Sequence, residues 1–178
     1  MTRKELEIFL DAAYSKADYD LMFKQVAGDY NLFSMLWTIA CEKPATEAWR
    51  ILWILDHATE KRNEFIFPIL DELYRQVLAT KNESYIRLGM RLILRCPVNE
   101  DFAGELLDKC ITWMTNPKAK ISSQGLGLDF FYQTCKLYPE MAPELLALID
   151  DIMERSPSAG YKVRLKRIRE ELHKKGLY

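Results

Sequence analysis

The segment YIRLGMRLILR, residues 85–95, carries the pattern on which the rest of the chain is built. Its arginines, Arg87, Arg91 and Arg95, stand four residues apart and therefore share one face of an α-helix with 3.6 residues per turn. Most of the residues between them are apolar, which is typical of a helix that packs against others. The segment predicts one helix, over about 83–96, that carries a stripe of three arginines.

Outward from this helix, one apolar register occurs four times. Each set occupies positions i, i+3, i+4 and i+7, and steps of 37 or 38 residues lead from one set to the next. The sets are Phe33, Leu36, Trp37 and Ala40; Leu70, Leu73, Tyr74 and Val77; Leu107, Cys110, Ile111 and Met114; and Leu145, Leu148, Ile149 and Ile152. This spacing predicts four helices that bury equivalent stripes.

A second helix follows each of these four after a short polar break. The breaks consist of turn-forming residues: Glu42-Lys43-Pro44, Lys81-Asn82-Glu83, Asn116-Pro117-Lys118 and Ser156-Pro157-Ser158. In the second helices, Arg50, Arg87 and Gln124 recur at intervals of 37 residues, and Arg164 follows after 40. The predicted helix pairs cover residues 31–58, 64–96, 100–137 and 140–175.

The first 28 residues form a separate, amino-terminal part of the pattern. Thr2 and Glu5 have the spacing of a capping box, which predicts a helix over about 3–15. A second helix is predicted over about 18–28, before Gly28 and Asp29. We expect residues 1–28 to cap the end of the repeats.

A period of 37 to 40 residues with two helices in each unit predicts a stacked α-solenoid, because one pair cannot bury its apolar stripe alone. The layout resembles HEAT repeats: a helix, a Pro/Asn/Ser turn, and a second helix with an early apolar-Arg step at Trp49-Arg50, Ile86-Arg87 and Val163-Arg164. The resemblance implies an all-α superhelix of about four helix pairs, within a single domain over 1–178. Armadillo and tetratricopeptide repeats fit the period less well, and a non-repetitive helical bundle is the alternative.

Composition restricts the functional class. The 178 residues are 49% hydrophobic with a net charge of −1, which argues against a generally basic protein that coats nucleic acid. No apolar run approaches the length that spans a bilayer, so we expect a cytoplasmic protein with no membrane partner. The cysteines, Cys41, Cys96, Cys110 and Cys135, contain no Cys-x-x-Cys pair and are expected to be reduced and structural.

The resemblance to HEAT repeats implies that first helices lie on the convex side and second helices line a concave side. Charges differ between the two sets. Three first-helix segments (64–80, 100–115 and 140–155) together carry −9, whereas the four second-helix segments carry +8. This segregation predicts a basic concave face that attracts acidic protein segments or other polyanions.

Six residues are candidates for binding a partner on that face: Trp49, Trp53, Arg91, Arg95, Lys120 and Arg164. An exposed tryptophan could stack on a base or hold a cation. The structural interpretation is that both tryptophans belong to the core and that arginines pair with acids of adjacent repeats. That interpretation is strongest for Arg50 and Arg87, which belong to the repeat itself.

The sequence contains no recognisable catalytic, metal or cofactor site. Its only histidines, His57 and His173, do not stand at helical ligand spacing from another histidine or a cysteine. Gly125-Leu126-Gly127 lacks the third glycine and the preceding strand of a phosphate-binding loop. We therefore expect no cofactor and no metal.

One enzyme class has a similar architecture. HEAT-like alkylpurine DNA glycosylases use a basic cleft with aromatic residues and an aspartate, and this chain resembles them in its basic inner face, its tryptophans, and Asp56 and Asp129. In that class the aspartate stabilises the developing cationic sugar. The alternative for Asp56 is a structural pair with Arg91 or Arg95 in the next second helix, and for Asp129 a cap or a bridge between repeats.

The sequence thus favours a non-enzymatic scaffold that binds a protein or an acidic peptide through its basic concave face. The alternative is a DNA-binding protein related to the glycosylases.

Overall fold

The structure is a computed structural model that describes residues 1–12 and 15–176. Two compact units make up the chain, Met1–Cys96 and Pro97–Tyr178, and each is described below by itself. Among the described residues every regular element is helical. The predicted all-α class is confirmed.

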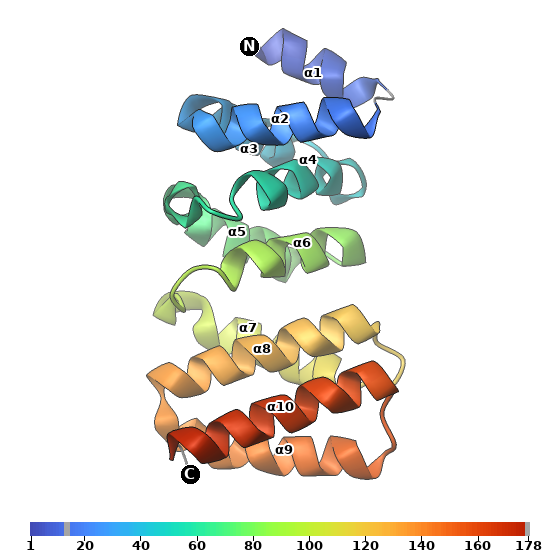
Figure 1. Cartoon of the computed structure of the whole chain (residues 1–178), viewed down its shortest axis with the longest axis vertical. Coiled ribbons are helices and arrows are strands. Elements are labelled where there is room, and N and C mark those ends of the chain that lie inside the picture. Colours follow the sequence, from blue (N-terminus) through green and yellow to red (C-terminus); the bar gives the residue numbers. More distant parts are fainter. Residues whose placement is uncertain (13–14, 177–178) are drawn as a thin grey trace. The chain divides into compact units, whose positions relative to one another are not determined.

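The amino-terminal unit consists of helices in two layers. In Figure 1, α2, α4 and α6 form one layer, while α3 and α5 lie behind them. The bounds are α1 Arg3–Asp11, α2 Lys16–Gly28, α3 Tyr30–Glu42, α4 Ala45–Ala58, α5 Leu70–Ala79 and α6 Glu83–Ile93, with two 3-10 turns at Asn63–Phe65 and Phe67–Ile69. Each helix of the front layer packs against the next, so α4 contacts both α2 and α6.

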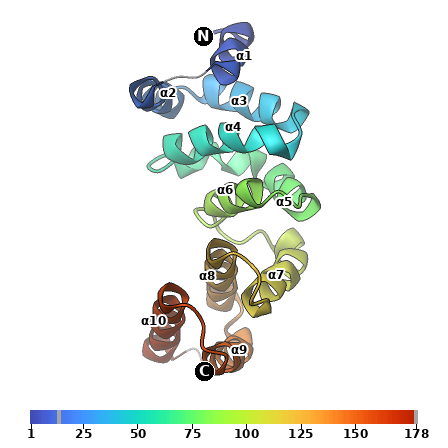
Figure 2. The same cartoon turned by 90° about the vertical axis from the view of Figure 1, so that its right-hand side faces the viewer.

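The carboxy-terminal unit repeats this plan with two helix pairs. Helices α8 and α10 pack against each other, α7 packs against α8, and α9 packs against α10 (Figure 2). The bounds are α7 Glu100–Thr115, α8 Ile121–Leu137, α9 Ala142–Glu154 and α10 Ala159–Lys175, with a 3-10 turn at Pro139–Met141. The two-helix repeat predicted from the 37-residue step is therefore present in both units.

The apolar register found in the sequence forms the core. All its members are buried except Leu70, Ile111 and Leu148, which are partly exposed. The second helix of each pair packs against the first helix. In two of the second helices, α6 and α8, a glycine allows the two helices to approach closely. A Cβ added at Gly127 would lie 2.9 Å from the backbone oxygen of Cys110, and one added at Gly89 would overlap the side chain of Val77. The helices of a pair therefore approach closely at these two positions, where a side chain would have to displace its neighbour.

Helix termini follow the predicted signals at some ends and not at others. Thr2 and Glu5 form the expected capping box. Helix α1 ends at Asp11, and residues 13 and 14 of the predicted helix 3–15 lie outside the described residues. The first helix of the pair predicted over 64–96 begins instead with 3-10 turns, and Pro68 lies where regular α-helical hydrogen bonds have not yet formed.

The helix predicted over 83–96 ends earlier, at Ile93. Arg95 consequently lies in the turn after α6, not on the helical stripe with Arg87 and Arg91. Pro97 follows, and the residue before a proline is disfavoured in the α conformation, which is consistent with an early end. The expected stripe of three helical arginines is thus a stripe of two.

Residues 1–28 contain α1 and α2, and their expected role as a cap of the repeats stays a prediction. Helix α2 packs against α4 in the same front layer in which α4 packs against α6. The single domain predicted over 1–178 stays a prediction. No described helix is both long and apolar enough to cross a membrane.

Candidate partner-binding site

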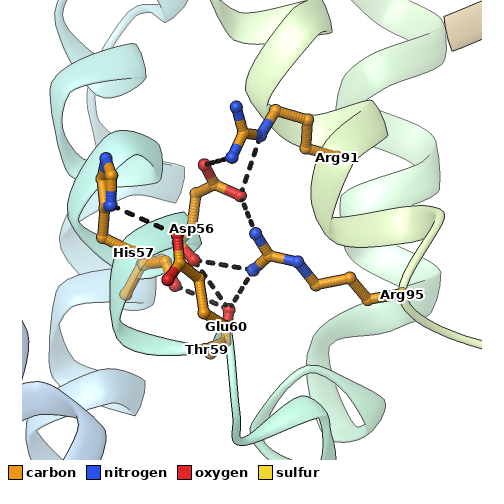
Figure 3. A network of polar contacts seen from close by, with 7 residues as sticks. Asp56, His57, Thr59, Glu60, Arg91 and Arg95 are labelled. Carbon is orange, nitrogen blue, oxygen red and sulfur yellow. Dashed lines mark hydrogen bonds and ion pairs between the residues drawn. The ribbon is translucent and has the colours of Figure 1, made fainter.

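A buried aspartate joins α4 to the segment that follows it in the front layer. Asp56, near the end of α4, is 1% exposed and accepts hydrogen bonds at Oδ1 from Arg91 Nε at 3.2 Å and Arg95 Nη2 at 2.5 Å. Arg91 Nη2 lies 3.0 Å from Oδ2, forming an ion pair (Figure 3). A carboxylate removed from water requires such partners, and here two guanidinium groups supply them.

Arg95 also satisfies the carboxyl end of α4. Its Nη1 donates to the backbone oxygen of Asp56 at 2.6 Å and to Thr59 Oγ1 at 2.9 Å (Figure 3). The last carbonyls of a helix lack intrahelical partners and carry partial negative charge, so a cation here is favourable. Arg95 is therefore a structural bridge between α4 and the turn after α6.

The carboxy-terminal unit contains a similar link. Asp129 of α8 receives a bidentate pair of hydrogen bonds from Arg164 of α10, including Nε to Oδ1 at 3.0 Å. Arg167 Nη2 lies 3.8 Å from the same Oδ1. Gly125 makes room for the arginine, since a Cβ there would lie 2.5 Å from Arg164 Nη1. In both units an aspartate of one second helix is bound by arginines of the next pair.

The acid pairing expected for Arg50 and Arg87 is not found. Among residues 1–12 and 15–176, neither guanidinium has an ion pair with a carboxylate. Arg50 contacts the Trp49 ring instead, with its Cζ 5.7 Å from the ring centroid. In the amino-terminal unit the structure thus reverses the expectation: Arg91 and Arg95 make the inter-repeat link, and Arg50 and Arg87 pair with no acid of the described residues. In the carboxy-terminal unit the register arginine, Arg164, does pair with an acid, Asp129.

A cavity of about 330 Å³ in the amino-terminal unit is bordered by Arg50, Arg87 and Arg91. We call it the Trp–Arg cleft, and its lining residues are Tyr19, Trp49, Arg50, Trp53, Asp56, His57, Arg87, Leu88 and Arg91. Helices α2, α4 and α6 supply all of them, so the cleft runs across the front layer.

Packed rings fix the aromatic wall of the cleft. Trp53 meets Tyr19 edge-on at 4.9 Å between ring centroids and Phe23 at 5.2 Å. His57 stacks on Phe23 at 4.6 Å, and its Nδ1 lies 3.6 Å from a Glu60 carboxylate oxygen (Figure 3). The two tryptophans of the lining are partly exposed, so neither is a fully buried core residue. The wall offers aromatic surface that a ligand can reach.

The predicted binding residues divide between several places. Trp49, Trp53 and Arg91 meet in the cleft. Arg95 binds Asp56 but does not line the cleft, and its side chain is 19% exposed. The other two belong to the carboxy-terminal unit, where Lys120 is exposed just before α8 and Arg164 is bound to Asp129.

Among the cleft residues, the sequence predicts only Trp49, Trp53 and Arg91 as binding candidates, and it favours a structural role for the arginines Arg50 and Arg87. One signal in the sequence could have separated the arginines that pair with an acid from those that do not. Arg91 follows Asp56 by 35 residues, and Arg164 follows Asp129 by the same 35. The positions 35 residues before Arg50 and Arg87 hold Ser15 and Leu52, neither of which is an acid.

Asp56 does not have the exposure that a catalytic role requires. It is almost completely covered, and both of its oxygens face guanidinium groups. A carboxylate that stabilises a cationic sugar must approach it closely. Asp56 therefore fits the structural interpretation, as a link between adjacent repeats. Among the described residues, no group of three or more His, Cys, Asp or Glu side chains is arranged to hold a metal ion.

Comparison with known families decides the class of the fold. A family model described as a HEAT repeat domain matches residues 6–172. The chain belongs to this HEAT repeat family. The match begins inside α1, so it includes most of residues 1–28, and it supports an all-α solenoid of HEAT repeats. HEAT repeats typically mediate protein interactions. No curated protein and no solved structure matched the chain.

Proposed function

We propose that this HEAT repeat protein is a non-enzymatic scaffold that holds an acidic segment of a partner protein in the Trp–Arg cleft. The observation that carries the proposal is the pair Arg50 and Arg87, which border one cavity and have no carboxylate partner among the described residues. A guanidinium group binds a carboxylate through two parallel hydrogen bonds. Arginines not already occupied in this way are the ones that can bind a ligand.

The position of these arginines supports a shared ligand. Arg50 of α4 and Arg87 of α6 are equivalent residues of adjacent repeats, 37 residues apart, and α4 packs directly against α6. Packed helices lie roughly 8–10 Å apart, a separation that two arginine side chains can span from both sides. An acidic segment that crosses the two helices would meet both guanidinium groups.

The aromatic wall supports a peptide as the ligand. Trp49 and Trp53 expose part of their rings beside the arginines. Tryptophan and arginine are among the residues that most often dominate the binding energy of protein interfaces. The wall would pack against the carbon atoms of the segment while the arginines bind its carboxylates.

Titration with a poly-glutamate peptide tests the proposal, with tryptophan fluorescence as the signal. We expect saturable binding that weakens as salt rises, because exposed charges are screened. The variant Arg50→Glu/Arg87→Glu should lose binding at least about tenfold. A matched control, Lys4→Glu/Lys81→Glu, makes the same charge change in the same unit with exposed lysines outside the cleft. Equal loss in both variants would show non-specific attraction and would contradict the proposal.

The DNA-binding alternative predicts a different result in the same assay. Duplex DNA would then bind more tightly than poly-glutamate, with a steep fall in affinity as salt rises. Residues 1–96 carry 13 lysines and arginines against 14 aspartates and glutamates, a net charge of −1. A unit with this balance lacks the broad positive field that a duplex requires, so poly-glutamate is expected to be preferred.

A further inference from the structure

The geometry of the Trp–Arg cleft points to a more specific ligand: the phosphoryl group of a phosphorylated side chain in the partner segment. This inference rests on the proposed function, since it concerns the same cleft and the same arginines. Beyond the proposed function, we infer that the cleft binds a phosphate monoester more tightly than a carboxylate. Three features support it: the number of guanidinium groups, the size of the cavity and the local extent of the positive charge.

Three guanidinium groups border the cleft, from Arg50, Arg87 and Arg91. Arg91 shares its charge with Asp56, but 42% of its side chain remains exposed. The other two have no acid to neutralise them among the described residues. A glutamate carries one negative charge, whereas a phosphate monoester carries about −1.5 to −2 at pH 7 and three acceptor oxygens. Arg91 holds Asp56 through its Nε and Nη2, so the full donor sets are those of Arg50 and Arg87. Their two positive charges exceed the charge of one carboxylate and match that of a phosphoryl group.

The cavity is larger than an isolated phosphate needs. Its volume of about 330 Å³ lies at the lower end of the range for small-ligand pockets, about 300–1,000 Å³. The remaining space is bounded by Trp49, Trp53 and Tyr19. These aromatic rings would cover the carbon atoms of the residue that carries the phosphate and exclude water from the arginines. Exclusion of water strengthens the attraction between charges.

The charge in this unit is concentrated, not spread. Residues 1–96 are nearly neutral as a whole, with a net charge of −1, yet three arginines meet at one cavity. Recognition of one phosphoryl group by an arginine cluster requires only a local positive site. A nucleic-acid strand, which carries a phosphate at every nucleotide, would bring its further phosphates close to the surrounding acids. The observations therefore favour a single phosphorylated residue in a protein over a nucleic-acid chain.

The test compares short peptides of one sequence, Gly-Ser-Gly-X-Gly-Ser-Gly, in which X is phosphotyrosine, phosphoserine, glutamate or tyrosine. We expect both phosphorylated peptides to bind at least about tenfold more tightly than the glutamate peptide by isothermal titration calorimetry. The tyrosine peptide should not bind measurably. Equal affinity for the glutamate and phosphorylated peptides would overturn the phosphoryl inference and leave the proposed function standing. Failure of all four peptides while poly-glutamate binds would overturn it too.

Two variants separate the roles of charge and geometry. Arg50→Lys/Arg87→Lys keeps the charges but removes the paired donors of the guanidinium group. We expect it to lose at least about tenfold in affinity for the phosphorylated peptides and to weaken poly-glutamate binding as well, because both ligands use the paired donors. Unchanged affinity for the phosphorylated peptides would overturn the inference. The control Lys4→Ala/Lys81→Ala should change neither. Failure of the wild-type chain to bind poly-glutamate would contradict the proposed function itself, so the two failures are distinct.

Discussion

The two units contain the same aspartate–arginine link in different surroundings. Asp56 and Arg91 in the amino-terminal unit, and Asp129 and Arg164 in the carboxy-terminal unit, are each 35 residues apart. Asp56 is 1% exposed, whereas the Asp129 side chain is 24% exposed. The difference indicates that the first link supports the core and the second lies nearer the surface.

The units differ more in what lies beside each link. Arg50 and Arg87 stand next to the first link and pair with no carboxylate of the described residues. The equivalent residue of α8 is Gln124, which is buried and donates to the backbone oxygen of Asn116. Beside it, Gly125 lets Arg164 lie close to α8. The same repeat register thus places two arginines beside a cleft in one unit and a buried glutamine in the other.

The largest difference in stability between the two links should appear when the aspartate of each is removed. Asp56→Ala leaves two guanidinium groups partly buried without their acceptor, and we expect the free energy of unfolding to fall by about 3 kcal/mol. Asp129→Ala should cost about 1 kcal/mol or less, because its pair is partly solvated. Chemical denaturation followed by circular dichroism measures both values. Equal costs for the two variants would contradict the difference in burial.

Arginine substitutions test which side chains are structural. Arg95→Ala removes the bonds to Asp56 and to the end of α4, and the expected cost is about 2 kcal/mol. Arg87→Ala breaks no ion pair of the described residues and should change stability by no more than about 0.5 kcal/mol. The same denaturation experiment compares them. A larger cost for Arg87→Ala would mean that the repeat-register arginine is part of the scaffold after all.

Two glycines of α8 offer a comparison within one helix. Gly127→Ala brings a methyl group against the backbone oxygen of Cys110, which cannot move without shifting α7, so we expect a loss of about 1.5 kcal/mol. Gly125→Ala meets the flexible end of Arg164 and should cost less than about 0.5 kcal/mol. Thermal unfolding of both variants tests this order. The reverse order would show that the Arg164 contact is more rigid than its exposure suggests.

A rise in pH should change the free energy of unfolding very little near neutrality and should lower it increasingly above about pH 8. Burial raises the pKa of the Cys135 thiol to about 12 and that of the Cys96 thiol to about 11. Burial also raises the pKa of Cys110 and Tyr161. Unfolding returns these groups to ordinary pKa values, so the unfolded chain releases protons first as pH rises. Their contribution to stability is complete below about pH 8 and is lost as pH rises toward about 12.

Denaturation at about pH 7.5, 9 and 10.5 measures this effect on both sides of the ordinary thiol pKa. The control is Cys135→Ala, which removes one titrating group and should flatten the alkaline part of the curve. Wild-type and variant proteins with identical slopes would show that the buried thiol does not contribute.

Much of the fold could be predicted because its signals are local and repeated. The register that runs from Phe33 to Ile152 identifies the buried stripe, and prolines such as Pro44 and Pro117 mark the turns. The predicted end of α6 was wrong, since the helix ends at Ile93. The turn that follows places Arg95 against the carbonyl of Asp56, a contact between residues 39 apart in sequence. Helical periodicity contains no information about such a contact.

The site was less predictable because arginines that look alike in the sequence have different partners in space. Arg91 and Arg95 have no counterpart in the neighbouring repeat, which made them candidates for binding, yet Asp56 binds both. Arg87 matches the repeat and was expected to be structural, yet it borders the cleft and pairs with no acid of the described residues. Trp49 lies in the same cleft, one helical turn from the second tryptophan of α4. Pairing depends on where an acid stands in the next helix, and the register of apolar residues does not report it.

The most direct test of the central claim observes individual guanidinium groups by nuclear magnetic resonance. Nε–H signals of Arg91 and Arg164, which donate to aspartates, should be protected from exchange and visible in the free protein. The Nη–H signals of Arg95, which donate to Asp56 and Thr59, should be protected as well. Signals of Arg50 and Arg87 should be broadened by exchange. Addition of poly-glutamate should sharpen and shift the Arg50 and Arg87 signals and leave Arg95 unchanged. A shift of the Arg95 signals with no change in the signals of Arg50 and Arg87 would contradict the assignment of Arg50 and Arg87 to ligand binding.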